Sequence, residues 1–220
     1  MKKDTKPQSS DFFTVEAYKL ARTNISLSVF KQGCKCILFT SAQANEGKTT
    51  TVCNIAAAFS KQVNTSVLLI DCDLRKPSVS KFFRLNNAPG VTNYLSGMCG
   101  LNEIIQRVPN TELSVITAGL IPPNPSELLS SEAFSKMLDK LSGEFDYILI
   151  DTSPVNVVVD AVPVAKVCDG TVLVVYENKT NYQELDKAVD SLKRVGAHVL
   201  GFVLNASKAD GSRYQQAYRR

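Results

Sequence analysis

The sequence predicts an α/β fold with a mostly parallel sheet and helices on both faces. Three observations support this fold class. Apolar, strand-like segments alternate along the chain with amphipathic, helix-like segments. Several strand-like segments are nearly continuous runs rich in Val and Ile, as expected for strands covered on both faces. A phosphate-loop sequence joins the first of these strands to the next helix. The length of 220 residues suits one sizeable domain of this class.

The expected elements follow one another in a regular order. Strands are expected at residues 36–40, 66–70, 113–117, 147–150, 170–176 and 198–204. Helices are expected at residues 48–62, 126–142 and 180–195. In the last of these helices, Leu185, Ala188 and Leu192 fall on one face. Parallel strands joined through such helices imply right-handed crossovers.

Composition and charge exclude several classes of protein. With 44% hydrophobic and 21% charged residues, the composition is that of a globular chain rather than a disordered one. The net charge of +4 is too small to indicate a nucleic acid partner. A single histidine and six cysteines without C-x-x-C spacing argue against a zinc cluster or a histidine-based triad. The apolar runs are too short to span a bilayer, and the N-terminus lacks the apolar core of a signal peptide.

Basic residues gather at both ends of the chain and suggest three regions. Residues 1–12 are expected to form a flexible basic arm, residues 13–206 the folded domain, and residues 207–220 a flexible tail with two tyrosines. The basic ends could contact anionic lipid or an acidic partner, or they could simply keep the chain in solution.

Residues 41–50 read SAQANEGKTT and directly follow the first expected strand. In a parallel sheet, ligands bind at the carboxyl ends of the strands. Gly47, Lys48 and Thr49 match the end of a phosphate-binding loop, in which the lysine contacts the β- and γ-phosphates and the hydroxyl ligates Mg²⁺. Backbone N–H groups of the loop and of the next helix would point at phosphate oxygens. The expected nucleotide-binding residues are Ala44, Asn45, Glu46, Gly47, Lys48, Thr49 and Thr50.

Three carboxylates are expected at the same edge of the sheet as this loop. Asp71 and Asp73 follow the apolar run VLLI, and Asp151 follows the run YILI. Mg²⁺ prefers oxygen ligands and often needs only one or two carboxylates besides phosphate oxygens and water. The three aspartates together predict a magnesium nucleotide site, whereas each one alone could simply cap a helix or a turn.

These motifs resemble those of bacterial tyrosine kinases of the polysaccharide-assembly type. The family's Walker A motif is matched by residues 42–49, with Ala42 at the place of the first glycine. Its Walker A′ motif, apolar-D-x-D-x-R, is matched by residues 70–75, and its Walker B motif, apolar-D-T-x-P, by residues 150–154. Further stretches that resemble the family are residues 90–97 and 122–129. The resemblance implies the P-loop NTPase fold and phosphoryl transfer from ATP, with Mg²⁺, to tyrosine.

The resemblance also suggests roles for single residues. Lys48, the loop amides and Mg²⁺ would neutralise the charge that develops during transfer. A tyrosine hydroxyl has a pKa near ~10, so a carboxylate base is useful. Asp71 is expected to be that base while also lying near the ion, and Asp73 is the second candidate. Thr49 is expected to ligate Mg²⁺ directly and Asp151 through water.

Two residues of the loop depart from the family pattern. Ala44 and Asn45 stand where Pro and Gly are usual. Asn is the non-glycine residue that best tolerates a left-handed backbone, so Asn45 is expected to keep the turn. Loss of the proline at Ala44 should loosen the empty loop without removing a phosphate ligand. By resemblance to related P-loop ATPases, Asn205 at the end of the last strand is expected to hydrogen-bond the adenine.

Near the N-terminus, Glu16, Lys19 and Arg22 resemble the family's E-x-x-R-x-x-R segment, which joins subunits into a ring. Their spacing places them along one helix face, suited to ion pairs between subunits. Lys19 stands where the family has Arg and cannot form the same planar bidentate pair, so the ring could be weaker or differently bonded. Without the resemblance, the same residues would be a solvated charged helix face.

The resemblance implies an acceptor and partners as well. Family members carry a tyrosine cluster at the C-terminus that neighbouring subunits phosphorylate in trans, and this chain offers Tyr214 and Tyr218. The expected partners are a membrane-embedded polysaccharide copolymerase that activates the kinase, a protein tyrosine phosphatase and further copies of the chain. The expected location is the cytoplasm, at the inner face of the plasma membrane.

Two other functions fit parts of the sequence. A partitioning or division-type P-loop ATPase would share the fold, but residues 41–46 lack the lysine that is characteristic of that class. The tyrosines of the tail would also have no purpose in such an ATPase. A non-catalytic, nucleotide-dependent scaffold of the polysaccharide machinery would explain both the unusual loop start and the sparse tyrosine cluster.

Overall fold

The computed structural model describes residues 9–206, and these contain a seven-stranded sheet. The strands are β1 (Lys35–Ser41), β2 (Val67–Cys72), β3 (Ile105–Arg107), β4 (Leu113–Ile116), β5 (Tyr147–Thr152), β6 (Gly170–Tyr176) and β7 (Val199–Asn205). Their order across the sheet is β3-β4-β2-β5-β1-β6-β7. All neighbouring strands are parallel except β3 and β4. The predicted, mostly parallel sheet is therefore confirmed.

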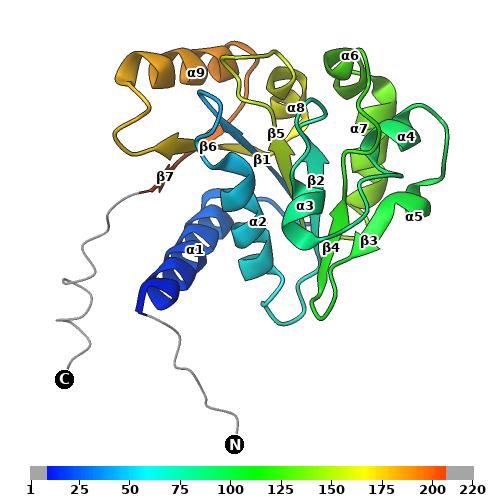
Figure 1. The fold of residues 1–220 in the computed structure, drawn as a ribbon, viewed down its shortest axis with the longest axis horizontal. Helices are drawn as coiled ribbons and strands as arrows, with labels where there is room; N and C mark the ends of the chain where they lie inside the picture. Colours follow the sequence, from blue (N-terminus) through cyan, green and yellow to red (C-terminus); the bar gives the residue numbers. More distant parts are fainter. Residues whose placement is uncertain (1–8, 207–220) are drawn as a thin grey trace, which may run out of the picture.

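Helices cover both faces of this sheet. They are α1 (Ser9–Ser28), α2 (Lys48–Phe59), α3 (Val79–Phe83), α4 (Val91–Leu95), α5 (Leu101–Ile104), α6 (Pro125–Leu129), α7 (Glu132–Leu141), α8 (Ala161–Val167) and α9 (Tyr182–Arg194). Figure 1 shows α1 and α2 on one side of the sheet and α7, α8 and α9 on the other. The expected three-layer arrangement is confirmed.

The core consists of two apolar clusters, because successive strand residues point to opposite faces of a sheet. On β1, Ile37 and Phe39 belong to the same cluster as Phe59 of α2. Leu38 belongs to the other cluster, together with Phe134 of α7. All six residues of β2 are buried. Runs of Val, Ile and Leu without polar alternation therefore form central strands that are covered twice.

Several elements differ from what the sequence predicts, and the short helices α3, α4, α5 and α8 were not among the expected ones. Residues 126–142 were expected to form one helix, but α6 and α7 are separate because Ser131 caps α7, accepting a hydrogen bond from the N–H of Phe134 (3.2 Å). The antiparallel strand β3 was not predicted, since three residues are too few to show a periodicity. Helix α1 begins at Ser9, so residues 9–12 belong to it rather than to a separate arm. The expected tail, with Tyr214 and Tyr218, lies outside the described residues.

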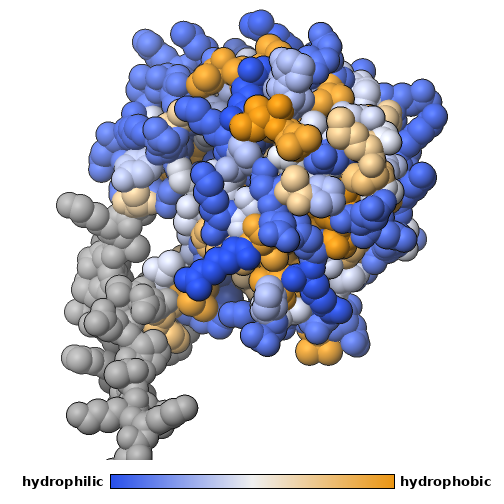
Figure 2. Space-filling view, turned by 45° about the vertical axis from the view of Figure 1, so that its right-hand side comes forward, coloured by the Kyte–Doolittle hydropathy of each residue, from blue (hydrophilic) through white to orange (hydrophobic). Residues whose placement is uncertain are grey.

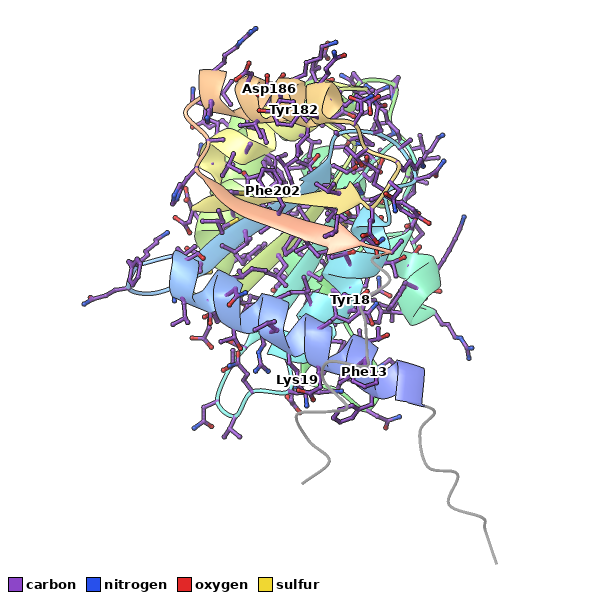
Figure 3. All side chains as sticks on the ribbon, turned by 90° about the vertical axis from the view of Figure 1, so that its left-hand side faces the viewer. Phe13, Tyr18, Lys19, Tyr182, Asp186 and Phe202 are labelled. Carbon is purple, nitrogen blue, oxygen red and sulfur yellow. The ribbon has the colours of Figure 1, made fainter. Side chains whose placement is uncertain are left out.

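The edge strand β7 lies between α1 and α9. Figure 3 shows Phe202 of β7 between α9, which carries Tyr182 and Asp186, and α1, which carries Tyr18 and Lys19. On the face seen in Figure 2, hydrophobic residues form separate groups within a mostly hydrophilic surface. Within residues 9–206, no helix combines the length and the apolar character that a bilayer span requires.

Candidate active site

A cavity of about 500 Å³ opens at the carboxyl end of β1, where the phosphate loop leads into α2. Its other wall is the segment that follows β2 and includes α3. Figure 1 shows α3 beside α2 at this place. The lining residues are Ser41, Ala44, Asn45, Glu46, Gly47, Lys48, Thr49, Thr50, Asp73, Lys76, Ser78, Lys81, Phe82 and Pro154. All seven residues predicted for the phosphate loop therefore line one cavity.

The backbone of the loop adopts the left-handed conformation at two positions. Asn45 has φ 61° and Gly47 has φ 81°. The expectation that Asn45 keeps the turn is confirmed. A side chain at Gly47 would place its Cβ only 1.9 Å from Nδ2 of Asn205. Glycine is required at position 47 both by its backbone conformation and by the closeness of β7.

The carboxylate of Glu46, 1% exposed, holds the loop from behind. It accepts a hydrogen bond from the N–H of Gln43 (2.9 Å) and another from the hydroxyl of Thr180. The amide of Asn205 donates to the carbonyl of Glu46 (3.0 Å). Asn205 was expected to meet the adenine, and in this structure it supports the phosphate loop.

A lysine outside the motif also holds the loop. The ammonium of Lys179 donates to the carbonyls of Ala44 (3.3 Å) and Asn45 (3.2 Å). Lys179 and Thr180 precede α9, and sequence reasoning missed both, because no motif marks them. Lys179 contacts the two loop residues that depart from the family pattern, and Thr180 contacts Glu46.

The predicted cation and carboxylates meet directly beneath the loop. The ammonium of Lys48, a residue that is 6% exposed, lies 2.6 Å from Oδ1 of Asp151 and 3.5 Å from Oδ2 of Asp73. The hydroxyl of Thr49 donates to Oδ2 of Asp151 (2.6 Å). Asp71 and Asp151 are register partners on the adjacent strands β2 and β5, which explains how distant segments bring these carboxylates together.

Burial and mutual charge shift the pKa values of this cluster. Burial lowers the pKa of Lys48, but the negative charges of Asp151 and Asp73 outweigh it, so the net pKa is raised. Burial, together with the charge of Asp151, raises the pKa of Asp71 to about 7. Burial also raises the pKa of Asp151, against the opposing effect of Lys48. Lys48 therefore stays protonated, and Asp71 ionises near neutral pH.

Asp71 and Asp73 occupy different environments although they are two residues apart. The fully buried carboxylate of Asp71 accepts hydrogen bonds from the N–H groups of Asp73 (3.1 Å), Ser78 (3.1 Å) and Val79 (3.0 Å). Asp73 lines the cavity and accepts a hydrogen bond from the hydroxyl of Ser153 (2.9 Å). Asp71 thus organises the segment after β2, and Asp73 is the carboxylate that reaches the cavity.

Arg75, the last residue of the Walker A′ motif, forms a bidentate ion pair with Asp160. The two nitrogen–oxygen distances are 2.7 and 3.1 Å. Asp160 is fully buried and also accepts a hydrogen bond from the hydroxyl of Ser126 (2.9 Å). Sequence reasoning missed Asp160, because it follows no recognisable motif. The pair ties the segment after β2 to the start of α8.

The donor set fits Mg²⁺. Thr49 and Asp151 present oxygen atoms next to the phosphate loop, and Asp73 adds a carboxylate at the cavity wall. Among residues 9–206 no three His, Cys, Asp or Glu side chains are grouped as a metal site. Mg²⁺ does not need such a group, since it keeps several waters and takes further ligands from substrate phosphates.

The three residues expected at a subunit interface lie on α1 and have different contacts within the subunit. Glu16 and Lys19 pair with each other at 2.7 Å on the exposed side of the helix. Arg22 instead donates to the carbonyl of Ala58 in α2 (3.0 Å). Within the subunit, Arg22 therefore joins α1 to α2, and the Glu16–Lys19 pair faces solvent.

The chain is similar to known proteins over most of its length. A family model described as an AAA domain matches residues 34–198. The tyrosine-protein kinase YwqD of Bacillus subtilis (strain 168) is 37% identical over 204 residues, which cover 93% of this chain and 84% of that protein. The kinase domain of the Escherichia coli tyrosine kinase ETK has a TM-score of 0.83 at 30% identity and covers 89% of this chain and 78% of that chain.

The class of division-type ATPases is related through the fold alone. The cell division ATPase MinD of Pyrococcus furiosus has a TM-score of 0.67 at 23% identity, covering 80% of this chain and 74% of that chain. The kinases are similar in sequence as well as in structure over most of the chain. The protein therefore belongs to the bacterial tyrosine-protein kinases and shares their P-loop NTPase fold.

Proposed function

We propose that the protein transfers the γ-phosphoryl group of ATP to tyrosine hydroxyls and thereby regulates the synthesis and export of a capsular or extracellular polysaccharide. One observation carries the proposal of phosphoryl transfer. The buried ammonium of Lys48 lies between two carboxylates, within a loop whose residues line a cavity of about 500 Å³. Such a site can hold a triphosphate and neutralise the charge that develops during transfer.

Each residue of the site has a proposed role. The amides of residues 44–50 and the ammonium of Lys48 bind the phosphates, and Thr49 and Asp151 hold Mg²⁺, with Asp151 acting through water. When bound, Mg²⁺ supplies positive charge to the phosphate oxygens. Asp71 is the proposed base, with Asp73 as the second candidate, and Asn205 is proposed to meet the adenine besides supporting the loop.

The proposed step conserves atoms and electrons. The tyrosine hydroxyl gives its proton to Asp71, and the tyrosine oxygen forms a bond to the γ-phosphorus. The bond between that phosphorus and the β,γ-bridging oxygen breaks, and ADP leaves with the electron pair. The raised pKa of Asp71, about 7, suits a group that takes up a proton at neutral pH.

The acceptor, assembly and partners are proposed from the resemblance to the kinase family. Tyr214 and Tyr218 are the proposed sites of autophosphorylation in trans, within a ring in which Glu16, Lys19 and Arg22 meet a neighbouring subunit. A membrane-embedded polysaccharide copolymerase is proposed to activate the kinase at the inner face of the plasma membrane, and a tyrosine phosphatase to reverse the modification. The folded domain, predicted as residues 13–206, then also includes residues 9–12 at the start of α1.

Mass spectrometry tests the proposal directly. The full chain is incubated with Mg-ATP, with and without the cytoplasmic segment of the copolymerase, and phosphotyrosine is mapped, with Lys48→Met as the control. We expect phosphate on Tyr214 or Tyr218 that is lost in the control. ATP turnover without phosphotyrosine would instead indicate a division-type ATPase. Nucleotide binding without either reaction would indicate a scaffold.

A further inference from the structure

Beyond Asp73, the cavity wall opposite the phosphate loop is basic. Residues 74–102 contain four cationic side chains and no Asp or Glu. Two of these cations, Lys76 and Lys81, line the cavity together with Phe82. We call these three residues the α3 rim.

The charges of the α3 rim are not offset within the described residues. Arg75, on the same segment, is paired with Asp160. Lys76 and Lys81 are exposed and form no ion pair within residues 9–206. The deeper cation of the cavity, Lys48, is already balanced by two carboxylates. The α3 rim therefore offers lysines that no carboxylate of the described residues pairs with.

The aromatic member of the α3 rim is held in place and still accessible. Phe82 is 43% exposed, and its ring meets that of Phe83 edge to face with the centroids 4.9 Å apart. Phe83 in turn packs against the core cluster that contains Val79. A ring fixed in this way offers a surface against which another aromatic side chain can pack at a small entropic cost.

The position of the α3 rim suits an acceptor better than a nucleotide. The phosphate loop follows β1, whereas the rim follows β2, and β5 lies between these two strands. Both candidate bases belong to the segment that leads into the rim: Asp73 lines the same cavity, and the N–H groups of Ser78 and Val79 donate to the buried carboxylate of Asp71. A hydroxyl that meets Asp73 in the cavity therefore lies next to the rim.

We propose that the α3 rim binds the acceptor polypeptide and selects tyrosines that are flanked by acidic side chains. Phe82 packs against the acceptor ring, and Lys76 and Lys81 pair with the flanking carboxylates. The inference rests on the proposed kinase function and adds the class of its substrate.

The chain's own tyrosines have the opposite charge pattern. Residues 207–220 contain Lys208, Arg213, Arg219 and Arg220 but a single acidic residue, Asp210. Like charges on the rim and around Tyr214 and Tyr218 disfavour docking. Tyrosines in the tail are therefore poorer acceptors than a tyrosine in an acidic segment of another protein.

Matched peptides test this preference. Two peptides of equal length carry one tyrosine flanked either by glutamates or by arginines, and each is offered to the full chain with Mg-ATP. We expect the acidic peptide to be preferred about tenfold in kcat/KM, as two exposed charge pairs allow. In the double variant Lys76→Gln/Lys81→Gln, the KM for the acidic peptide should rise until the two peptides are used almost equally. The KM for ATP should stay unchanged.

Controls separate the acceptor from the nucleotide and from general charge effects. Arg84→Gln removes an exposed cation of the same segment that does not line the cavity, and it should leave the preference intact. Phe82→Ala should weaken both peptides equally. An unchanged preference in the double variant, or a KM for ATP that rises as much as the KM for the peptide, would overturn the inference.

A binding measurement keeps the α3 rim testable apart from catalysis. Fluorescence anisotropy of the labelled acidic peptide is measured with the protein saturated by Mg²⁺ and a non-hydrolysable ATP analogue. Tighter binding of the acidic peptide that is lost in Lys76→Gln/Lys81→Gln supports the inference even if no phosphotyrosine forms, in which case the kinase proposal alone fails. Equal binding of both peptides to the wild-type protein contradicts the inference even if the tail is phosphorylated.

Discussion

The two walls of the cavity differ in how their polar groups are satisfied. On the phosphate-loop side, Glu46, Lys48 and Asp151 are buried, and each has hydrogen-bond or ion-pair partners within the chain. On the α3 side, Lys76 and Lys81 are exposed and have no ion pair within residues 9–206. Groups that are already paired within the chain are held in one geometry, which suits a single kind of ligand. Exposed, unpaired cations cost the fold little free energy, and their side chains can adjust to a ligand.

The largest effect is expected at Asp71, the buried carboxylate that accepts three hydrogen bonds from the α3 wall. Asp71→Asn should lower kcat by about 10²–10⁴-fold, because an amide cannot accept the proton of the tyrosine. Binding of an ATP analogue should change little. Phosphotyrosine formation and analogue affinity are measured side by side, with Asp73→Asn as the matched variant. A normal rate in Asp71→Asn together with a lost rate in Asp73→Asn would move the base to Asp73.

The pH dependence of the wild type follows from the same carboxyl. Its pKa is about 7 in the folded chain against an ordinary value of 3.8, so the folded state binds more protons between these pH values. Asp71 therefore contributes fully to the free energy of unfolding below pH 3.8, its ordinary pKa. This contribution is lost as the pH rises through about 7. Since the base must be ionised, kcat/KM should rise with pH up to about 7 and then level off. A profile that is flat from pH 5 to 8 would contradict this.

At the loop itself, Gly47→Ala should weaken ATP binding by at least about tenfold. Alanine in the left-handed conformation is strained by roughly 1–2 kcal/mol. Its Cβ would in addition lie 1.9 Å from Asn205 Nδ2 and force that amide away from Glu46. Isothermal titration with an ATP analogue measures the effect. Gly97→Ala is the control, because Gly97 has a similar φ of 72° but a Cβ added there would meet no atom within 4 Å.

Behind the loop, Thr180→Val should weaken ATP binding by about tenfold and leave kcat nearly unchanged. The substitution removes the hydroxyl that donates to the buried carboxylate of Glu46, and an unsatisfied buried acceptor costs about 1–3 kcal/mol. Thr180→Ser retains the hydroxyl and should restore affinity. Tyr182→Phe, at an exposed side chain two residues further on, should have no effect. If Thr180→Ser binds ATP as weakly as Thr180→Val, the hydroxyl is not what holds the loop.

The smallest effect is expected on the α3 side. Lys81→Gln should change the free energy of unfolding by no more than about 0.5 kcal/mol, as is usual for exposed positions without ion pairs. Chemical denaturation measures this value. A substantially larger loss would show that Lys81 helps to hold α3, and the contrast between the two walls would no longer apply.

Local patterns were enough to predict most of the fold. Continuous Val and Ile runs marked the central strands, because strands covered on both faces have no polar side to interrupt the run. Likewise, Gly47, Lys48 and Thr49 marked the phosphate loop, since the chemistry of phosphate binding fixes residue types at adjacent positions. The strand β3 and the break between α6 and α7 could not be predicted in this way, because they depend on an edge pairing and on one serine cap.

The sequence by itself determined the fold class, the phosphate loop and the set of aspartates at the sheet edge, because each of these depends on residues that are close together in the sequence. Only the tertiary structure decided which aspartate reaches the cavity, since Asp71 and Asp73 are equivalent in the motif but differ in burial. It also brought Lys179, Thr180 and Asn205 behind the loop and placed the α3 rim across from it. The contacts behind the loop join residues more than a hundred positions apart, and only the packing of β2, β6 and β7 around β1 and β5 brings them together.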